Sequence, residues 1–149
     1  MHFSRLFTAT LFGLSQAIIS GFTVPSTIKA GDGFKFQINT ANYIQGVQDV
    51  AGAAGIIPGA GSQGALGELL GSFYLGPKDS NIVTPIDKRL KMPSDVPSGN
   101  AVLSAAFFSL YGEAMSQTMT TYNVTVIIGE KTSTNTVTSS PQSYLSCSV

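Results

Sequence analysis

The sequence predicts an all-β protein, an immunoglobulin-like antiparallel β-sandwich with a flexible C-terminal tail. Three observations support this fold class. Short runs rich in β-branched and aromatic residues recur along the chain, clusters of Gly, Pro, Asn and Asp separate them, and no long amphipathic helix is apparent. The chain has 149 residues, one Cys and no Trp, so it lacks the cysteine pair and core tryptophan of a true immunoglobulin domain. A small β-barrel is the alternative architecture.

The first half of the chain contains one regular strand between two less regular ones. Residues 22–28 begin with β-forming residues and include a Pro, which favours an edge strand. Residues 34–39 alternate apolar and polar side chains with period two, the pattern of a half-buried strand. Residues 47–57 are apolar and rich in Ala and Gly, which is typical of a buried strand. Periodicity alone does not distinguish that segment from a buried helix.

The second half of the chain begins with a glycine-rich loop at residues 58–64. Residues 65–75 carry several large apolar side chains, and this spacing allows a helical turn followed by a strand. The apolar residues of 82–90 are loosely spaced and indicate one or two short strands. Residues 102–111 and 118–128 are rich in aromatic or β-branched residues and predict two more strands.

The N-terminus has the layout of a secretory signal peptide over residues 1–17. A weakly basic start precedes an apolar run at residues 6–14, and Ser15 and Ala17 place small residues at the −3 and −1 positions of a peptidase cut. The run is shorter than the ~20 apolar residues that span a bilayer. We therefore expect a secreted, extracellular protein that has no membrane span and begins near Ile18, with a second possible cut near Gly21.

We expect residues 18–129 to form the folded domain and residues 130–149 to form a disordered tail. Half of the tail residues are Ser or Thr, and this composition offers little apolar area to offset the entropy of ordering. Cys147 lies in this tail and is the one cysteine, so no internal disulfide can form. An inert thiol and a disulfide between two chains both remain open for Cys147.

One Asn-x-Ser/Thr site occurs in the sequence, at Asn123-Val124-Thr125. A secreted chain passes the enzymes that attach glycans to this motif, so the protein could be a glycoprotein modified at Asn123. The site lies inside a predicted strand, and its use depends on which face of the strand Asn123 occupies.

The composition argues against several functional classes. Eight Lys and Arg residues balance eight Asp and Glu residues, so nothing indicates electrostatic binding to nucleic acid. The one His is His2, inside the predicted signal peptide, so the secreted chain would offer no imidazole to act as general base or metal ligand. We therefore expect a protein that is not an enzyme, with no catalytic residues, no metal and no cofactor.

Two motifs could carry chemistry, and both have simpler interpretations. Residues 59–64 match G-x-G-x-x-G, but Pro58 precedes the motif and no second strand-helix unit follows, so a loop is favoured over a dinucleotide site. Among the carboxylates, Asp49 stands beside a predicted buried strand. We expect its carboxylate to hold a neighbouring loop through backbone N–H groups.

A block at residues 43–49 (Tyr-Ile-Gln-x-x-Gln-Asp) begins a longer pattern. It is followed by an Ala/Gly-rich strand, by Gly-Ile-Ile-Pro-Gly at 55–59, by Leu-Gly pairs at 66–67 and 70–71, and by Leu-x-Ala-Ala-Phe-Phe-Ser at 103–109. In order and spacing this resembles the Nis-type family of necrosis-inducing secreted proteins of filamentous fungi, over residues 22–129. The Ser/Thr-rich tail is not part of the resemblance.

This resemblance implies a secreted fungal effector, a virulence protein directed at plant cells that it contacts or enters. The implied activity is non-catalytic binding of host immune receptor-associated kinases, which suppresses pattern-triggered immunity and can induce cell death. The resemblance supplies no binding site at the level of residues. The alternatives are a secreted carbohydrate- or cell-wall-binding β-sandwich module, which the lack of Trp disfavours, and a small hydrolase, which the lack of His disfavours.

We expect the protein to be a monomer. Its residues suggest where a partner could bind. Tyr and apolar residues near loop ends are favoured at interfaces, and a basic cluster can meet an acidic patch. The alternatives are ordinary core packing for the first group and a solvated strand edge for the second. The candidate contact residues are Tyr43, Ile44, Gln45, Gln48, Asp49, Lys88, Arg89 and Lys91.

Overall fold

The computed structural model describes residues 16–146, which form two β-sheets and contain no helix. The first sheet has the strand order β6-β3-β1-β9, with bounds Ile86–Lys91, Gly33–Tyr43, Gln16–Pro25 and Thr136–Thr138. The second has the order β10-β8-β7-β4-β5, with bounds Ser140–Ser146, Ser116–Gly129, Gly99–Tyr111, Val47–Pro58 and Glu68–Tyr74. A short strand, β2 (Thr27–Lys29), pairs with β8 in parallel, whereas the other pairs are antiparallel.

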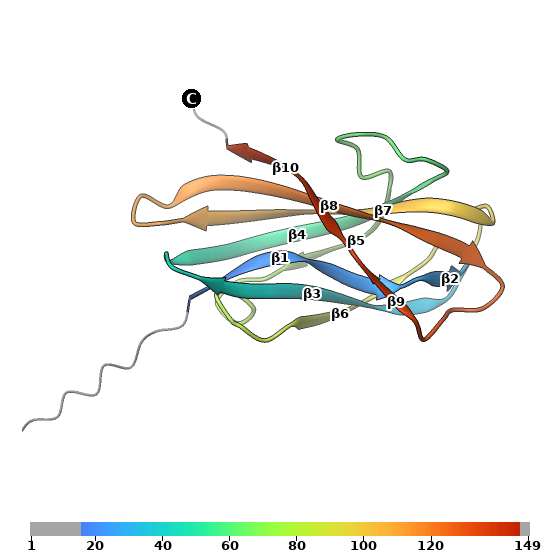
Figure 1. Ribbon diagram of the computed structural model, residues 1–149, viewed down its shortest axis with the longest axis horizontal. Coiled ribbons are helices and arrows are strands. Elements are labelled where there is room, and N and C mark those ends of the chain that lie inside the picture. Colours follow the sequence, from blue (N-terminus) through green and yellow to red (C-terminus); the bar gives the residue numbers. More distant parts are fainter. Residues whose placement is uncertain (1–15, 147–149) are drawn as a thin grey trace, which may run out of the picture.

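The two sheets pack face to face as a sandwich, as Figure 1 shows. Alternation along β7 explains this packing, because from residue 101 to 109 the odd positions are buried and their even-numbered neighbours are partly exposed. Phe22 and Phe36 stack at a centroid distance of 4.8 Å, and Phe107 contributes from the opposite sheet. The predicted all-β sandwich is therefore confirmed, while its likeness to the immunoglobulin arrangement stays a prediction.

The first strand differs from the edge strand that its Pro indicated. β1 lies between β3 and β9, and Pro25 is tolerated because it is the last residue of the strand. At Ser26 the chain then crosses from the first sheet to the second, where β2 begins. Ser26 N–H donates to the carbonyl of Asn135, and its own carbonyl accepts from Ile127 N–H at 2.9 Å. The expected single strand over 22–28 is thus two strands in different sheets.

Gln16 and Ala17 are the first residues of β1. Ala17 is buried and pairs with Asn42 of β3. The signal-peptide residues 1–15 lie outside the described part of the chain, and the expected cut before Ile18 falls within β1. The signal peptide and its boundary both stay predictions.

The Ala/Gly-rich segment is strand β4, and the buried helix that periodicity left open is wrong. Its small residues make room for aromatic rings of the core. A Cβ atom at Gly52 would lie 2.7 Å from the ring of Phe107 and 2.8 Å from that of Phe73. The glycine-rich segment 59–64 connects β4 to β5, and strand β5 follows instead of a helical turn. Its glycines therefore do not open a helix that could bind a pyrophosphate.

The predicted disordered tail, 130–149, is wrong for residues 130–146. β9 pairs with β1, β10 pairs with β8, and the chain changes sheet at Ser139. Ser139 is buried, its N–H donates to the carbonyl of Phe22, and its hydroxyl accepts from Phe22 N–H. Composition disfavoured order, but backbone pairing and the packing of Val137 against the core supply the missing stabilisation. Cys147 lies outside the described residues.

Candidate functional site

Two turns meet at one end of the sandwich, which lies on the left in Figure 1. One connects β3 to β4 and the other connects β7 to β8. Gly112 N–H donates to the carbonyl of Gly46 at 2.9 Å and so joins the two turns directly. Tyr43 and Tyr111 pack edge to face, with centroids 5.9 Å apart and an interplanar angle of 88°. We call residues 43–46 and 111–115 together the tip.

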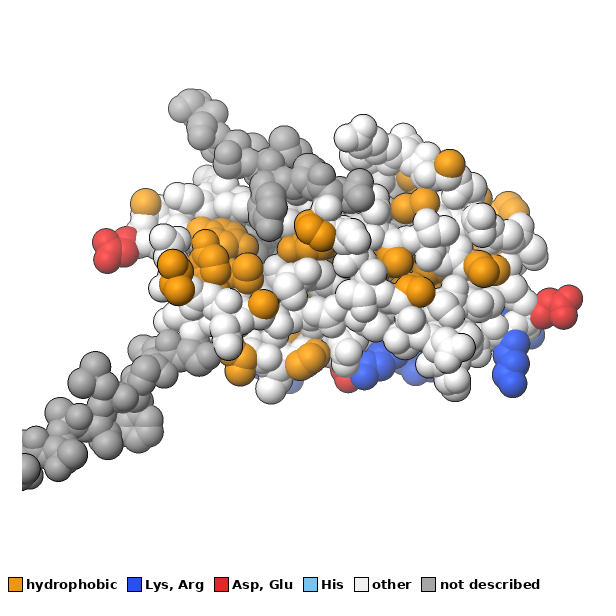
Figure 2. All heavy atoms as spheres, viewed as in Figure 1, with side chains coloured by type: hydrophobic (Ala, Val, Ile, Leu, Met, Phe, Trp, Pro, Cys, Tyr) orange, Lys and Arg blue, Asp and Glu red, His pale blue; other side chains and the backbone are white. Residues whose placement is uncertain are grey.

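The tip exposes apolar side chains that do not pack in the hydrophobic core. Ile44 is 93% exposed, and Met115 of the neighbouring turn is 43% exposed. Gln45 and Gln48 are exposed beside Ile44. Figure 2 shows hydrophobic atoms gathered over this end of the molecule, while Lys and Arg atoms lie along the lower side. A nearly fully exposed Ile on a turn that backbone and aromatic contacts hold in place has the properties of a contact residue.

Asp49 is buried behind the tip and does not contact solvent. The residue is 2% exposed, and Ser109 donates its hydroxyl to Asp49 Oδ1 at 2.6 Å. The backbone N–H of Asn81 approaches Oδ2 at 3.5 Å, and Asp49 N–H donates to Ser80 Oγ at 2.8 Å. The Asn81 side chain in turn accepts from Ala17 N–H at 2.7 Å. Asp49 therefore fixes the β5–β6 loop against β4 and β7, as expected of a loop-holding carboxylate.

Burial raises the pKa of Asp49 above its usual 3.8, and the hydrogen bonds from Ser109 and Asn81 lower it by less. The folded protein therefore holds the Asp49 proton at pH values where the unfolded chain has lost it. The stability that this proton contributes is fully present below the unfolded pKa and is lost as the pH rises through the folded pKa. Ionised Asp49 thus opposes folding near neutral pH.

We predict that Asp49→Asn, which has no proton to lose, removes this pH dependence. As the pH rises from below 3.8 toward neutrality, the free energy of unfolding of the wild type should fall relative to that of the variant. Each tenfold change in the acid constant is worth about 1.4 kcal/mol. Denaturant titrations over a pH series measure the difference.

Asp87→Asn is the control for this prediction, because hydrogen bonds from Gln37 and Lys35 lower the pKa of Asp87. Its stabilising effect is present above the unfolded pKa and is lost as the pH falls, so the difference from wild type should have the opposite sign. A difference for Asp49→Asn that is constant or grows in favour of the wild type with rising pH would contradict the argument.

The basic cluster of the sequence does not form one surface. Lys88 is largely covered and pairs with Asp79 at 2.6 Å. Arg89 and Lys91 are exposed on β6, where they pair in register with Lys35 and Gly33 at the start of β3. That position is far from Tyr43, the last residue of β3. Lys88 is therefore tied to Asp79, and the other two cations lie away from the tip.

The structure brings together only part of the predicted contact set. Tyr43, Ile44 and Gln45 share the tip, and Gln48 is exposed at the start of β4. Asp49 is wrong as a contact residue, because burial and the bond from Ser109 keep it from any partner. Sequence reasoning missed Met115, a residue in a turn whose neighbourhood depends on the pairing of β7 with β8.

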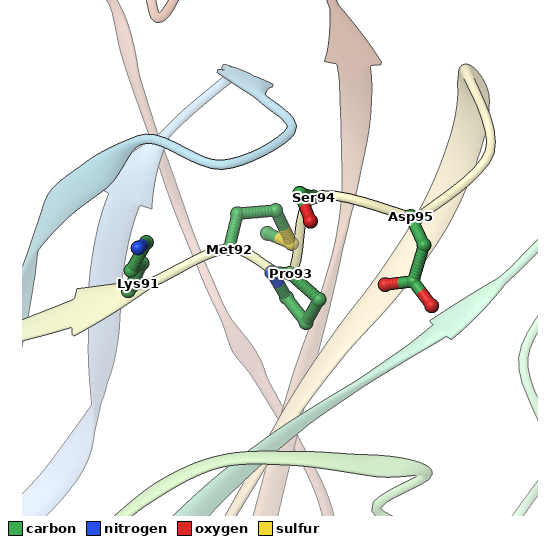
Figure 3. A pocket seen from close by; sticks show the side chains of 5 residues that line it. All are labelled: Lys91, Met92, Pro93, Ser94 and Asp95. Atoms are coloured by element: carbon green, nitrogen blue, oxygen red, sulfur yellow. The ribbon is translucent and has the colours of Figure 1, made fainter.

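Few other features of the described residues suggest chemistry. A shallow pocket of about 300 Å³ follows β6 and is lined by the consecutive residues 91–95, shown in Figure 3. It lies at the turn of Ser94 and Asp95 that follows β6, and Met92, which also lines it, is buried. Within residues 16–146 no three His, Cys, Asp or Glu side chains gather as metal ligands would. The same residues include no helix of the length and hydropathy that a membrane crossing needs.

A small β-sandwich that presents apolar side chains on the turns at one end belongs to a class in which loops on a rigid scaffold contact other molecules. Within that class, the chain belongs to the Nis1 family, whose sequence model matches residues 15–127. This confirms the family resemblance that residues 43–49 and the later motifs indicated.

Two relatives extend the comparison, and both have the name "Necrosis-inducing secreted protein 1". The protein from Colletotrichum orbiculare is 46% identical over 132 residues, which are 88% of this chain and 82% of the relative. The protein from Colletotrichum higginsianum is 46% identical over 126 residues, which are 84% of this chain and 88% of the relative. Their names describe secreted proteins, and the predicted secretion of this chain is thereby confirmed.

Proposed function

We propose that this protein is a secreted fungal effector that binds a plant immune receptor-associated kinase, suppresses pattern-triggered immunity and leads to cell death. Membership of the Nis1 family supports this proposal, together with relatives whose name is "Necrosis-inducing secreted protein 1". The structural observation that carries it is the tip, where Ile44 is 93% exposed on an ordered turn. Binding, not catalysis, is the proposed activity.

The tip is suited to insertion into a pocket on a partner protein. The Tyr43–Tyr111 contact and the hydrogen bond from Gly112 to Gly46 fix the turn before binding, so little conformational entropy is lost when Ile44 is covered. Full burial of such a side chain contributes about 1.5–3 kcal/mol. The exposed amides of Gln45 and Gln48 lie at its border, where a polar rim is expected.

The proposed mechanism is steric. A sandwich bound by its tip to a kinase would cover the surface that receives a substrate or a partner receptor, without a chemical step of its own. In this mechanism the sheets act as a support, and the effect on immunity depends on occupancy of the kinase surface. The same contact would act in the host cytosol, which the effector has to reach.

We predict that Ile44→Asp weakens kinase binding by about 2 kcal/mol or more, roughly thirtyfold, because a charge replaces the apolar contact. The test is calorimetric titration of the secreted protein into purified cytosolic domains of plant immune receptor kinases. Leaf infiltration with each variant then measures cell death and the immune oxidative burst. The loss of binding should be matched by loss of both effects in the leaf.

Leu69→Asp is the matched control, because Leu69 is also exposed (61%) but lies on β5, away from the tip. It should bind the kinase as the wild type does. Equal loss in both variants would show that the tip is not the contact. Saturable polysaccharide binding without kinase retention would overturn the effector proposal in favour of a wall-binding module, and turnover of a substrate would overturn both.

A further inference from the structure

The outer face of the six-stranded sheet is nearly free of charge. Strands β7 and β8 contain no Asp, Glu, Lys, Arg or His, and the one charged residue of β4, Asp49, points inward. The other sheet differs, because Lys35, Asp87 and Arg89 are exposed on β3 and β6.

The loop between β4 and β5 folds back over this face and creates a groove. Gly59 N–H donates to the carbonyl of Asn100 at 2.7 Å, and at Gly61 the loop passes so close to Val102 that a Cβ atom would lie 2.8 Å from that side chain. Residues 62–66 form one wall of the groove, and β7 and β8 form its floor. Its volume is about 310 Å³, at the lower end of the ~300–1,000 Å³ typical of sites for small molecules.

Asn123 lines this groove from β8. Its neighbour Tyr122 is buried in the core, so alternation places Asn123 on the outer face. The residues opposite it in the sheet are Ser104 of β7 and Ser140 of β10, both small. Within residues 16–141, whose side chains are described, the Asn123 amide makes no hydrogen bond, so its nitrogen is available for a covalent link.

The remainder of the glycosylation motif lies on the same face. Thr125 is two residues further along β8, and its side chain is exposed. The wall and floor around Asn123 combine apolar atoms of Leu66, Ala106 and Met119 with the hydroxyl of Ser104. This mixture suits a sugar ring, which has both apolar C–H faces and hydroxyl groups.

We propose that Asn123 carries an N-linked glycan and that its first sugar lies in this groove. The donor is a lipid diphosphate-linked oligosaccharide of the secretory pathway. The bond between sugar C1 and the diphosphate oxygen breaks, and the oxygen keeps the electron pair. A bond from C1 to Asn123 Nδ2 forms, and one proton leaves Nδ2. The attached glycan covers part of the uncharged sheet face, and the proposal depends only on secretion of the chain.

Secretion of the full chain from yeast, followed by mass measurement of the intact protein, tests the attachment. Treatment with a peptide-N-glycosidase should remove the added mass and convert Asn123 to aspartate. Asn123→Gln and Thr125→Ala should both be secreted without the glycan, and the conservative Thr125→Ser should retain it. Secreted wild-type protein with unmodified Asn123 would overturn the proposal.

Two methionines of equal exposure test the position of the sugar. Met119 lines the groove, whereas Met115 lies in the β7–β8 turn, and each is 43% exposed without a glycan. Hydrogen peroxide oxidises exposed methionine to the sulfoxide, which peptide mass analysis counts at each site. The glycan should slow oxidation of Met119 severalfold and leave Met115 unchanged, compared with Asn123→Gln. Equal rates in the two proteins would contradict the placement in the groove.

Discussion

Replacement of Phe107 with alanine should lower the free energy of unfolding by about 3–5 kcal/mol. The ring is 1% exposed and lies between Phe73, at a centroid distance of 6.4 Å, and Tyr122, at 6.1 Å. Its removal takes apolar area from the core and leaves a cavity that strands fixed on both sides cannot close. Urea titration followed by far-ultraviolet circular dichroism measures the loss.

The adjacent residue gives a matched comparison. Phe108 is on the same strand but on the outer face, where it pairs with Ala51 and Met119 and is partly exposed. Phe108→Ala should lower the free energy of unfolding by about 1 kcal/mol or less, because water and neighbouring side chains can occupy the space on this outer face. If the two variants lost equal stability, the assignment of the two faces of β7 would be wrong.

A second large effect is expected from Gly55→Ala. An added Cβ atom would lie 2.3 Å from the carbonyl oxygen of Leu66 and 3.0 Å from that of Glu68. Both are backbone atoms, so relief requires a shift of the β4–β5 connection and not of a flexible side chain. The cost should approach the upper end of the roughly 1–3 kcal/mol found for overpacked cores.

The control for this variant is Gly46→Ala in the tip. A Cβ atom at Gly46 would meet no atom within 4 Å, and the residue does not have a positive φ angle. Its stability should therefore stay within about 0.5 kcal/mol of the wild type. A loss of stability at Gly46 as large as that at Gly55 would mean that the close approach of the Leu66 carbonyl is not the cause of the loss.

Strands β3 and β7 could be predicted, because the residues within each strand are enough to indicate it. The expected segment 34–39 lies inside β3, and 102–111 lies inside β7. In β3 the apolar positions face the opposite sheet, so period two and burial coincide, whereas β7 also carries apolar residues such as Val102 and Phe108 on its outer face. The structure mainly extends these strands at their ends.

β9, β10 and the separation of β2 from β1 could not be predicted, because distant partners stabilise these strands. β2 has three residues, and its pairing with β8 joins positions about a hundred residues apart. The segment 130–146 has the composition of a linker, yet Ser133 bonds to Thr27 N–H and Ser26 Oγ, and Thr132 bonds to Asp32. Hydroxyl groups that suggest disorder in isolation thus act as partners for exposed backbone groups.

The candidate site was predicted in part. The exposure of Ile44 follows from its place in a turn, and Tyr43 next to it was identified from the same block. Tyr111 and Met115 belong to the β7–β8 hairpin. The sequence shows where this hairpin lies along the chain, but not that it lies beside the turn of Tyr43 and Ile44. Asp49 was expected correctly to hold a loop but wrongly to contact a partner, because burial and the bond from Ser109 keep it inside.

The C-terminal segment has a consequence for how the protein is made. β9 adds to β1 in one sheet and β10 adds to β8 in the other, with buried Ser139 between them. Synthesis and export proceed from the N-terminus, so β9 and β10 emerge after the strands with which they pair. The nascent chain can pair β3, β4, β7 and β8 first, and it gains its full set of strands only when β9 and β10 have followed.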